Sequence, residues 1–234
     1  MSWWRLLFRK RPQLEPTQQA SLERYHRLPQ ADLKRPSKAI RFVVVDVETT
    51  GLRLDRDRLI AIGAMPVEED LVRLDACFEV VLRQAKPSAH DNILVHGIDG
   101  STQTSGRDPA EALIDFVQYA RKDLLVGFHT DFDRVMINRA AREALGIELE
   151  NRWLDLAFVA PELLREQSPG ASTLDDWTER LEIENPMRHN AVADALVTAQ
   201  LLQVVLAAGR QRGLRHCEEL VDIERAGRWL RTHR

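Results

Sequence analysis

Hydrophobic residues in the first half of the chain come in short runs with strand-like spacing. The segments 41–46, 58–65 and 76–84 are rich in aliphatic residues and are bounded by polar ones, so they predict three strands. The stretch PVEEDLVRL, which begins at Pro66, suits a hairpin-like connection between the second and third strands. We therefore expect these strands to be antiparallel neighbours.

From residue 108 onward, helical spacing alternates with short apolar runs. The stretch DPAEALIDFVQYAR has a candidate N-cap in Asp108, a proline at the first helical position, and Glu111 to close a capping box. After it, LLVGF predicts a buried strand, and DFDRVMINRAAREALG predicts a helix that ends at Gly146. The remaining predicted elements are a short strand at 153–156, helices at 156–166 and 173–181, and a long helix that ends at Gly209.

This order of elements predicts an α/β fold. We expect a mixed five-stranded sheet, with three antiparallel strands followed by parallel ones, flanked by helices over residues 39–209. Residues 1–38 hold several prolines among Gln, Arg and Lys, and we expect a flexible basic arm with at most short helices. Residues 210–234 are expected to form a C-terminal helical extension.

The net charge of −3 conceals an uneven distribution along the chain. Residues 1–40 hold nine Lys or Arg against three Asp or Glu, and residues 205–234 hold seven against four, which leaves −12 for residues 41–204. Two interpretations stay open for the basic ends: solvated tails, or segments that bind nucleic acid or a protein partner.

The cysteines and the hydropathy of the chain indicate the compartment in which the protein works and whether it spans a membrane. Cys77 and Cys217 lie far apart with no CxxC, which argues against a disulfide framework and favours a reducing, cytoplasmic compartment. We expect no membrane span, since no stretch approaches about 20 apolar residues. The N-terminal MSWWRLLFRKRP is a poor signal peptide. Its Trp and Phe beside Arg and Lys leave open a membrane-surface anchor or a partner-docking peptide.

The most apolar predicted strand ends in two acids. In RFVVVDVETTGL, Asp46 and Glu48 are two residues apart, so their side chains lie on the same face of the strand. Converging carboxylates repel each other unless a cation lies between them, and oxygen ligands suit Mg²⁺ or Mn²⁺. The strand end is therefore a candidate for half of a metal site. The alternative is a pair of surface acids at a strand-to-loop corner.

Further candidate ligands stand where other core elements begin. In LVGFHTDFDRVMI, Asp131 suits a helix cap, and Asp133 lies further into the helix. In RHNAVADAL, His189 precedes the last long helix and Asp194 lies in its early turns. Singly, these fit a loop histidine and an acid favoured by the helix dipole. Together with the strand-end acids they provide what two-metal phosphodiester hydrolysis requires, with histidine as general base.

These three motifs, in this order, resemble those of the DEDDh exonucleases, the family of the proofreading epsilon subunit of bacterial replicative polymerase. The match covers about residues 41–204 and includes the linking segments DRLIAIGAM and ILVHGIDG. The resemblance implies a ribonuclease H-like fold and two divalent cations, Mg²⁺ or Mn²⁺. It assigns metal-ligand roles to four carboxylates and the general base to a histidine: Asp46, Glu48, Asp133, Asp194 and His189.

The resemblance also implies three substrate contacts. Thr49 and Leu52 would touch the terminal nucleotide and His96 would lie near its base, although His96 also suits a turn before Gly97. The sequence departs from the family at three positions. His129 replaces a usual asparagine, Phe128 replaces a frequent histidine, and Ala61 replaces an acid of the second strand.

The leading hypothesis is a 3′→5′ exonuclease that removes nucleoside 5′-monophosphates from single-stranded DNA ends. The ETTG of the first motif favours DNA over RNA, whereas oligoribonucleases carry EMTG. Two alternatives remain: an exonuclease for RNA 3′ ends or short oligoribonucleotides, and a non-catalytic module that binds nucleic acid or a partner. A protein partner could dock through the N-terminal arm or the C-terminal helix.

Overall fold

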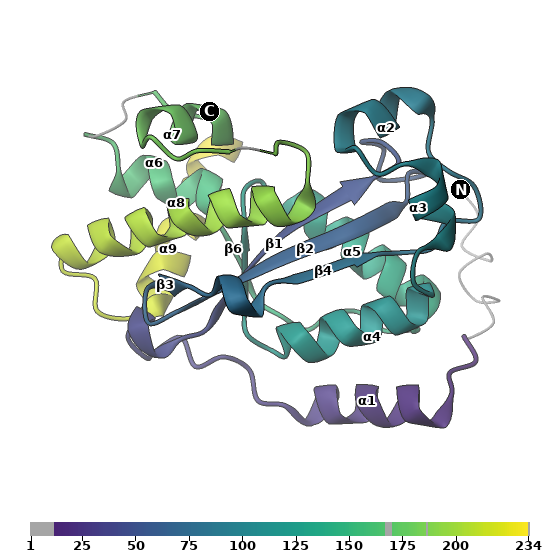
Figure 1. Ribbon diagram of the computed structural model, residues 1–234. Helices are drawn as coiled ribbons and strands as arrows, with labels where there is room; N and C mark the ends of the chain where they lie inside the picture. Colours follow the sequence, from purple (N-terminus) through teal and green to yellow (C-terminus); the bar gives the residue numbers. More distant parts are fainter. Residues whose placement is uncertain (1–11, 167–169, 186, 234) are drawn as a thin grey trace.

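The computed structural model describes residues 12–166, 170–185 and 187–233, and its centre is a mixed sheet (Figure 1). The strands follow the order β3-β2-β1-β5-β6, and β4 also pairs with β2. β2 is antiparallel to β1, β3 and β4, whereas β5 is parallel to both β1 and β6. The strands are β1 (Phe42–Thr49), β2 (Leu59–Glu68), β3 (Leu71–Val72), β4 (Phe78–Val81), β5 (Leu124–Gly127) and β6 (Trp153–Asp155).

The five predicted strands and their relative directions are confirmed, and a sixth, β3, lies within the connection that follows β2. Glu69 and Asp70 both have positive φ, at 53° and 66°, which turns the chain back on itself as in a tight hairpin. Val72 and Leu71 then pair with the end of β2. The expected hairpin therefore exists, but it closes onto a two-residue strand before the chain continues to β4.

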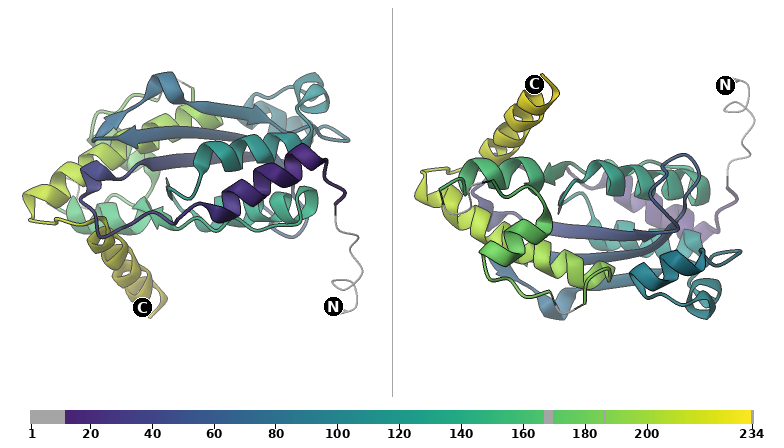
Figure 2. Two further views of the ribbon diagram at one scale, coloured as in Figure 1. Left: turned by 90° about the horizontal axis from the view of Figure 1, so that it is seen from below. Right: turned by 90° about the horizontal axis from the view of Figure 1, so that it is seen from above.

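Helices cover both faces of the sheet (Figures 1 and 2). One apolar core, which includes Val43, Val45 and Val47 of β1, involves α1 (Pro16–Arg27), α4 (Pro109–Ala120) and α5 (Asp131–Ala144). The core on the other face, which includes Val44, involves α6 (Leu156–Leu163), α7 (Leu174–Arg180), α8 (Ala191–Gln211) and α9 (Cys217–Thr232). The two short helices α2 (His90–His96) and α3 (Gly100–Ser105) complete the described part of the chain, with 3₁₀ turns at Ser37–Ala39 and Leu74–Ala76.

The expectation of a flexible arm with at most short helices is wrong for residues 12–38. They contain the 12-residue helix α1, and its Tyr25 is only 2% exposed. The Tyr25 hydroxyl donates to the Asn151 side chain at 3.0 Å and accepts from the Glu150 amide at 2.7 Å. The helix docks through few apolar positions among many polar ones, so its periodicity gave little signal. Residues 1–11 of the arm lie outside the described residues.

We expect Tyr25→Ala to lower the free energy of unfolding by about 3–5 kcal/mol, because it removes a buried aromatic ring and leaves a cavity. Tyr25→Phe, which loses only the two hydrogen bonds, should cost about 1 kcal/mol. Arg27→Ala on the exposed side of the same helix is the control. Urea denaturation measures all three. Equal stability of the Tyr25 and Arg27 variants would mean that α1 is not docked in solution.

Within the described residues, α8 is the one helix whose length and composition would allow it to span a membrane. Its mean hydropathy is 1.8. Its sequence therefore comes closer to a membrane span than we expected. In the structure the helix packs on the sheet through residues such as Ala195, Ala199 and Leu202. Core packing thus accounts for its composition.

Candidate active site

The two acids of β1 lie on the sheet face that α8 covers. Asp46 and Glu48 continue the alternation that places Val44 on this face and Val45 and Val47 on the other. The pairing of β1 with β2 shifts register between Glu48 and Thr49, which re-aims the strand where it ends. The structure therefore brings both carboxylates to one place, as the spacing predicts.

α8 begins directly above these acids because β2 leaves room for it. Gly63 of β2 is paired with Asp46, and a Cβ at Gly63 would lie only 2.2 Å from the carbonyl carbon of Ala191. The first turn of α8 thus rests on the bare backbone of the strand. Asn190 caps this turn by accepting the Ala193 amide at 3.0 Å. Gly63 was missed by the sequence analysis, although a glycine inside a strand is a signal of close approach.

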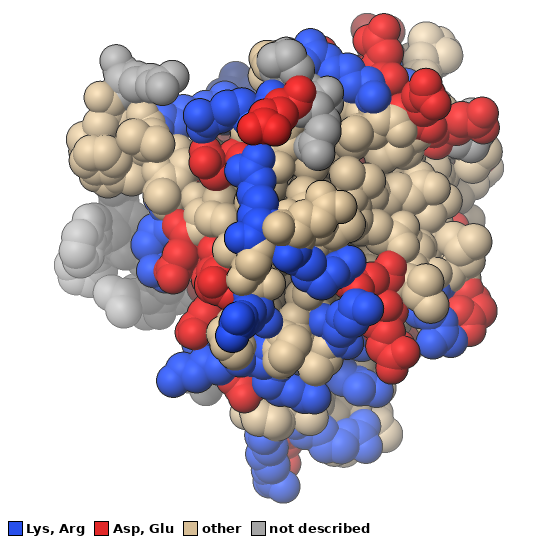
Figure 3. Space-filling view, turned by 90° about the vertical axis from the view of Figure 1, so that its left-hand side faces the viewer, with Lys and Arg blue, Asp and Glu red and all other residues tan. Residues whose placement is uncertain are grey.

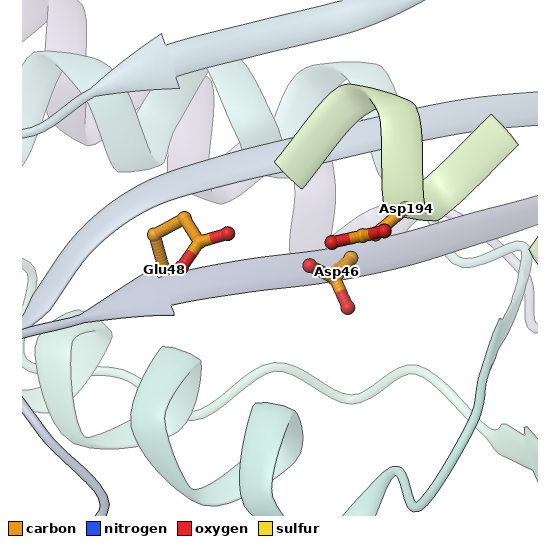
Figure 4. Close-up of side chains that lie close together, drawn as sticks. All are labelled: Asp46, Glu48 and Asp194. Atoms are coloured by element: carbon orange, nitrogen blue, oxygen red, sulfur yellow. The ribbon is translucent and has the colours of Figure 1, made fainter. Parts of the chain in front are cut away.

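This approach brings Asp194 of α8 to the acids of β1 (Figure 4). One oxygen from each of Asp46, Glu48 and Asp194 lies within 4.8 Å of the others. The Asp194 carboxylate is oriented by two donors, the Asn185 side-chain amide at 2.7 Å and the His189 backbone amide at 2.9 Å. Asn185 is a second residue that the sequence analysis missed, because no motif includes it.

α5 contributes Asp133, whose side chain points inward. Asp133 is 7% exposed and lies outside the three-residue cluster, yet its charge helps to raise the pKa of both Asp46 and Glu48. Asp131 instead lies at the surface, where it pairs with Arg134 and Arg228. The structure therefore buries one acid of this segment and leaves the other at the surface.

The site gathers acidic side chains without positive partners, so burial and mutual repulsion raise the pKa values of Asp46, Glu48 and Asp133. Burial is the largest cause of the raised pKa values, which reach about 8 for Glu48 and about 7 for Asp133, and stand well above the usual range for Asp46. Asp194 adds further repulsion. Within the described part of the chain, no Lys or Arg forms an ion pair with any of these four acids. One buried and three partly buried carboxylates without a basic counterion fit hard divalent cations.

His189 precedes Asp194 in the sequence and lies at the surface. Its backbone has a left-handed φ of 61°. Its backbone, not its ring, contacts Asp194. The ring has no hydrogen-bond partner among the residues that the structure describes. His189 is thus an exposed imidazole at the entrance to the first turn of α8.

The three candidate substrate contacts differ in how far they are exposed. Leu52 is 84% exposed, and it follows Gly51, whose φ of 155° is a conformation that other residues rarely adopt. The Thr49 hydroxyl donates to the Gly51 carbonyl at 2.8 Å. His96 is 5% exposed, and its ring accepts the Ile98 amide at 3.0 Å and faces the Ser88 hydroxyl. Of the three, Leu52 alone presents most of its side chain to solvent.

One more acid shapes the site without belonging to the cluster. Asp155 ends β6 and accepts the backbone amides of His129 at 2.9 Å and Thr130 at 3.1 Å, in the turn that leads from β5 into α5. Asp155 was not among the residues predicted from the sequence. Its signal was the one used for Asp46, an acid at the end of an apolar strand, in the stretch WLDLAF.

We expect the metal-free protein to lose stability progressively as the pH rises from about 4 to about 8. Glu48 and Asp133 have pKa values of about 8 and about 7 when folded, above their ordinary values of 4.5 and 3.8. The folded state therefore binds these protons more tightly than the unfolded chain, and the stability they give is lost as they dissociate. Bound Mn²⁺ should offset this loss, so metal should raise the unfolding temperature more at high pH.

Thermal unfolding with EDTA or with Mn²⁺, between about pH 5.5 and pH 8.5, measures this linkage. Glu48→Gln should shrink both the pH dependence and the effect of metal. A metal-induced rise in unfolding temperature that is the same at both ends of the range would contradict the prediction.

Comparison with known proteins identifies the family. The sequence pattern of the exonuclease family RNase_T matches residues 43–202. The DNA polymerase III PolC-type of Thermotoga petrophila is 25% identical over 183 residues, which are 78% of this chain and 13% of that protein. A DNA polymerase III subunit epsilon-like protein of Rhodobacter capsulatus is 28% identical over 201 residues, 84% of this chain and 28% of the relative. The chain thus spans less than a third of these relatives.

Solved structures show the same fold. E. coli Exonuclease I in complex with a dT13 oligonucleotide has a TM-score of 0.62 and 18% identity, over 74% of this chain and 42% of that one. Exonuclease X in complex with 5′ overhanging duplex DNA has a TM-score of 0.56 and 18% identity, over 78% of this chain and 99% of that one. The ribonuclease H-like fold and the exonuclease resemblance are both confirmed, and the chain belongs to the RNase_T exonuclease family.

Proposed function

We propose that the chain is a metal-dependent 3′→5′ exonuclease that releases nucleoside 5′-monophosphates from the ends of single-stranded DNA. The observation that carries this proposal is the site itself. Carboxylates from β1 and α8 meet within 4.8 Å, and Asp133 of α5 adds to their repulsion. Such a set of wholly or partly buried oxygen ligands without basic partners serves to bind cations rather than to stabilise the fold.

Each proposed residue has a distinct task. Asp46, Glu48, Asp133 and Asp194 would hold two Mg²⁺ or Mn²⁺ ions, which activate water and stabilise the leaving 3′ oxygen in phosphodiester hydrolysis. His189 accepts the proton of the attacking water, since its ring is exposed and has no partner among the described residues. Thr49 and Leu52 are proposed to contact the terminal nucleotide, and His96 is proposed to lie near its base.

Support for DNA as the substrate comes from the ETTG motif and from the relatives. Several of the similar proteins are named as DNA polymerases or were solved with DNA oligonucleotides. RNA 3′ ends are the second candidate substrate, since the carboxylate site itself does not distinguish the two. The proposed activity belongs in the cytoplasm, where the free, unpaired Cys77 and Cys217 stay reduced.

Contacts with longer nucleic acid or with a protein partner are proposed for the flanks of the domain. On the face shown in Figure 3, Lys and Arg side chains gather most densely in the lower part, with Asp and Glu among them. Basic surface of this kind suits phosphate groups. α9 presents Trp229 and Leu230, 60% and 50% exposed, which suit an apolar protein contact.

A cleavage assay with defined ends tests the proposal. Single-stranded DNA, duplex DNA and RNA, each labelled at the 5′ end, are incubated with protein and Mg²⁺ or Mn²⁺. We expect a ladder that shortens one nucleotide at a time, fastest on single-stranded DNA, and no cutting of a circular single strand. Cutting of the circle would contradict an exonuclease, and faster trimming of RNA would favour the second substrate. Asp46→Asn is the control for contaminating nuclease.

A further inference from the structure

The C-terminal helix contacts the turn before α5 from outside the part of the chain that matches the exonuclease family. That match ends at residue 202, whereas α9 spans Cys217–Thr232. Figure 2 shows that α9 starts against the body of the molecule and projects from it toward its C-terminal end. One of its residues, Arg228, points back to the start of α5, which carries Asp133.

Arg228 makes contacts on every side of its guanidinium group. Its Nη1 lies 2.7 Å from Asp131, its Nη2 lies 3.1 Å from Asp155, and its Nε lies 2.7 Å from Glu224. The guanidinium also lies over the ring of Phe158, with 4.6 Å between its carbon and the ring centroid. Several acceptors and an aromatic face together fix the group in one orientation.

Asp155 is the contact that matters most, because it is a buried charge. The residue is 1% exposed, and in the described structure Arg228 is the cation with which it forms an ion pair. Its carboxylate accepts three backbone amides, from His129, Thr130 and Ala157. A buried carboxylate with good donors but no counter-charge is costly, so Arg228 stabilises the arrangement of Asp155.

The backbone that Asp155 holds leads directly to a proposed metal ligand. His129 adopts a left-handed φ of 61°, an uncommon conformation for any residue but glycine. This turn changes the direction of the chain between β5 and α5, and Asp133 follows in the first turn of α5. Arg228 therefore contacts Asp155, Asp155 holds the turn, and the turn leads into the part of α5 that carries Asp133.

We propose that Arg228 is a positioning residue for the metal site: it fixes Asp155, which holds the β5–α5 turn so that Asp133 faces the other carboxylates. Arg228 touches neither substrate nor metal in this role. The inference rests on the proposed function only in taking Asp133 as a ligand. It makes α9 part of the working enzyme rather than an appended helix.

The expected effect is a loss of metal affinity more than a loss of fold. Replacement of a residue that orients a metal ligand typically lowers metal affinity or activity by about 10–100-fold. Arg228→Ala should raise the Mn²⁺ dissociation constant and the half-activating Mg²⁺ concentration by about that factor, with most of the maximal rate recovered at saturating metal. Arg228→Lys keeps the charge but loses the multiple contacts, so it should fall between Arg228→Ala and the wild type.

The test combines calorimetric titration of Mn²⁺ into the metal-free protein with activity assays over a range of Mg²⁺ concentrations. Arg225→Ala is the matched control, because Arg225 lies on the same helix and pairs only with the exposed Asp222 within the described structure. Thermal unfolding in EDTA reports the stability of each variant. Arg228→Lys serves for both measurements if Arg228→Ala does not fold.

The outcomes separate the two proposals. Weaker Mn²⁺ binding by the Arg228 variants, with wild-type binding by Arg225→Ala, supports the positioning role. Lower stability with unchanged Mn²⁺ affinity overturns it, since a purely structural contact predicts that result. If the wild type binds Mn²⁺ but cleaves no substrate, the proposed function fails and the titrations still decide the role of Arg228. A wild type that binds no Mn²⁺ overturns both.

Discussion

Asp46→Asn is expected to lower the rate of exonuclease cleavage by at least about 10³-fold while leaving the protein folded. Cation stabilisation of the reacting groups is worth several kcal/mol, and each 1.4 kcal/mol or so corresponds to a tenfold change in rate. The amide has nearly the same shape as the carboxylate but lacks the charge that attracts the cations. The same direction of change is expected for the other proposed ligands, in the variants Glu48→Gln, Asp133→Asn and Asp194→Asn.

The variant should also be more stable than the wild type when metal is absent. Burial and the charges of Asp133, Asp194 and Glu48 raise the pKa of Asp46, so its charged form is disfavoured in the folded protein. Removing the charge relieves this repulsion at pH values above the ordinary range of an aspartate. Metal-free stability should therefore rise at about pH 8 while activity is lost, which is the signature of groups kept for function.

Cleavage rates at saturating Mg²⁺ and thermal unfolding in EDTA check the two parts of this prediction. Glu111→Gln is the control, because Glu111 lies at the surface of α4, which belongs to the core on the other face of the sheet, and pairs with Arg107. It should change neither quantity. A wild-type rate in any one of the four ligand variants would remove that residue from the proposed metal site.

The position of a site residue could be predicted from the sequence where it is determined within a single strand or helix. The two-residue spacing of Asp46 and Glu48 placed both side chains on one face of β1, and the structure has them there. The strand-to-helix junction before α5 placed Asp133 near the end of the sheet for the same local reason. Period and capping rules act over a few residues, and these features lie within that reach.

Contacts between distant elements were not predictable in this way. Arg228 and Asp155 are 73 positions apart, and the hydrogen bond from Tyr25 to Asn151 joins residues 126 positions apart. Neither pair has a local pattern that joins its two residues: even the strand-end position of Asp155 says nothing about its partner Arg228. The same holds for Asn185, whose amide orients Asp194 from a loop without regular structure. Such partners become visible only when the fold is known.

His189→Ala is expected to lower the single-turnover rate by about 10²–10⁴-fold, the usual range for removal of a general base. The substitution isolates the ring from the rest of the site. The hydrogen bond to Asp194 comes from the His189 backbone amide, so the variant keeps it and with it the orientation of that carboxylate. Mn²⁺ affinity should therefore stay near the wild-type value, unlike that of the Arg228 variants.

The pH dependence of the variant gives a further test. With the proton acceptor removed, hydroxide from solution can take its place, so the variant should recover part of its rate as the pH rises. His189→Asn is a second variant, because asparagine tolerates the left-handed φ of 61° at this position better than alanine but cannot act as a base. It should lose as much activity as His189→Ala, which would exclude backbone strain as the cause.

His233→Ala controls for the loss of an exposed histidine elsewhere, since His233 lies at the end of α9 and contacts Trp229. Single-turnover rates for wild type and variants are measured from acidic to alkaline pH at saturating metal. A solvated loop histidine would give His189 variants that match the wild type throughout, and that result would end its role as the base. Loss of rate together with loss of Mn²⁺ affinity would instead mean that residue 189 acts through Asp194, because only a disturbed carboxylate would weaken both.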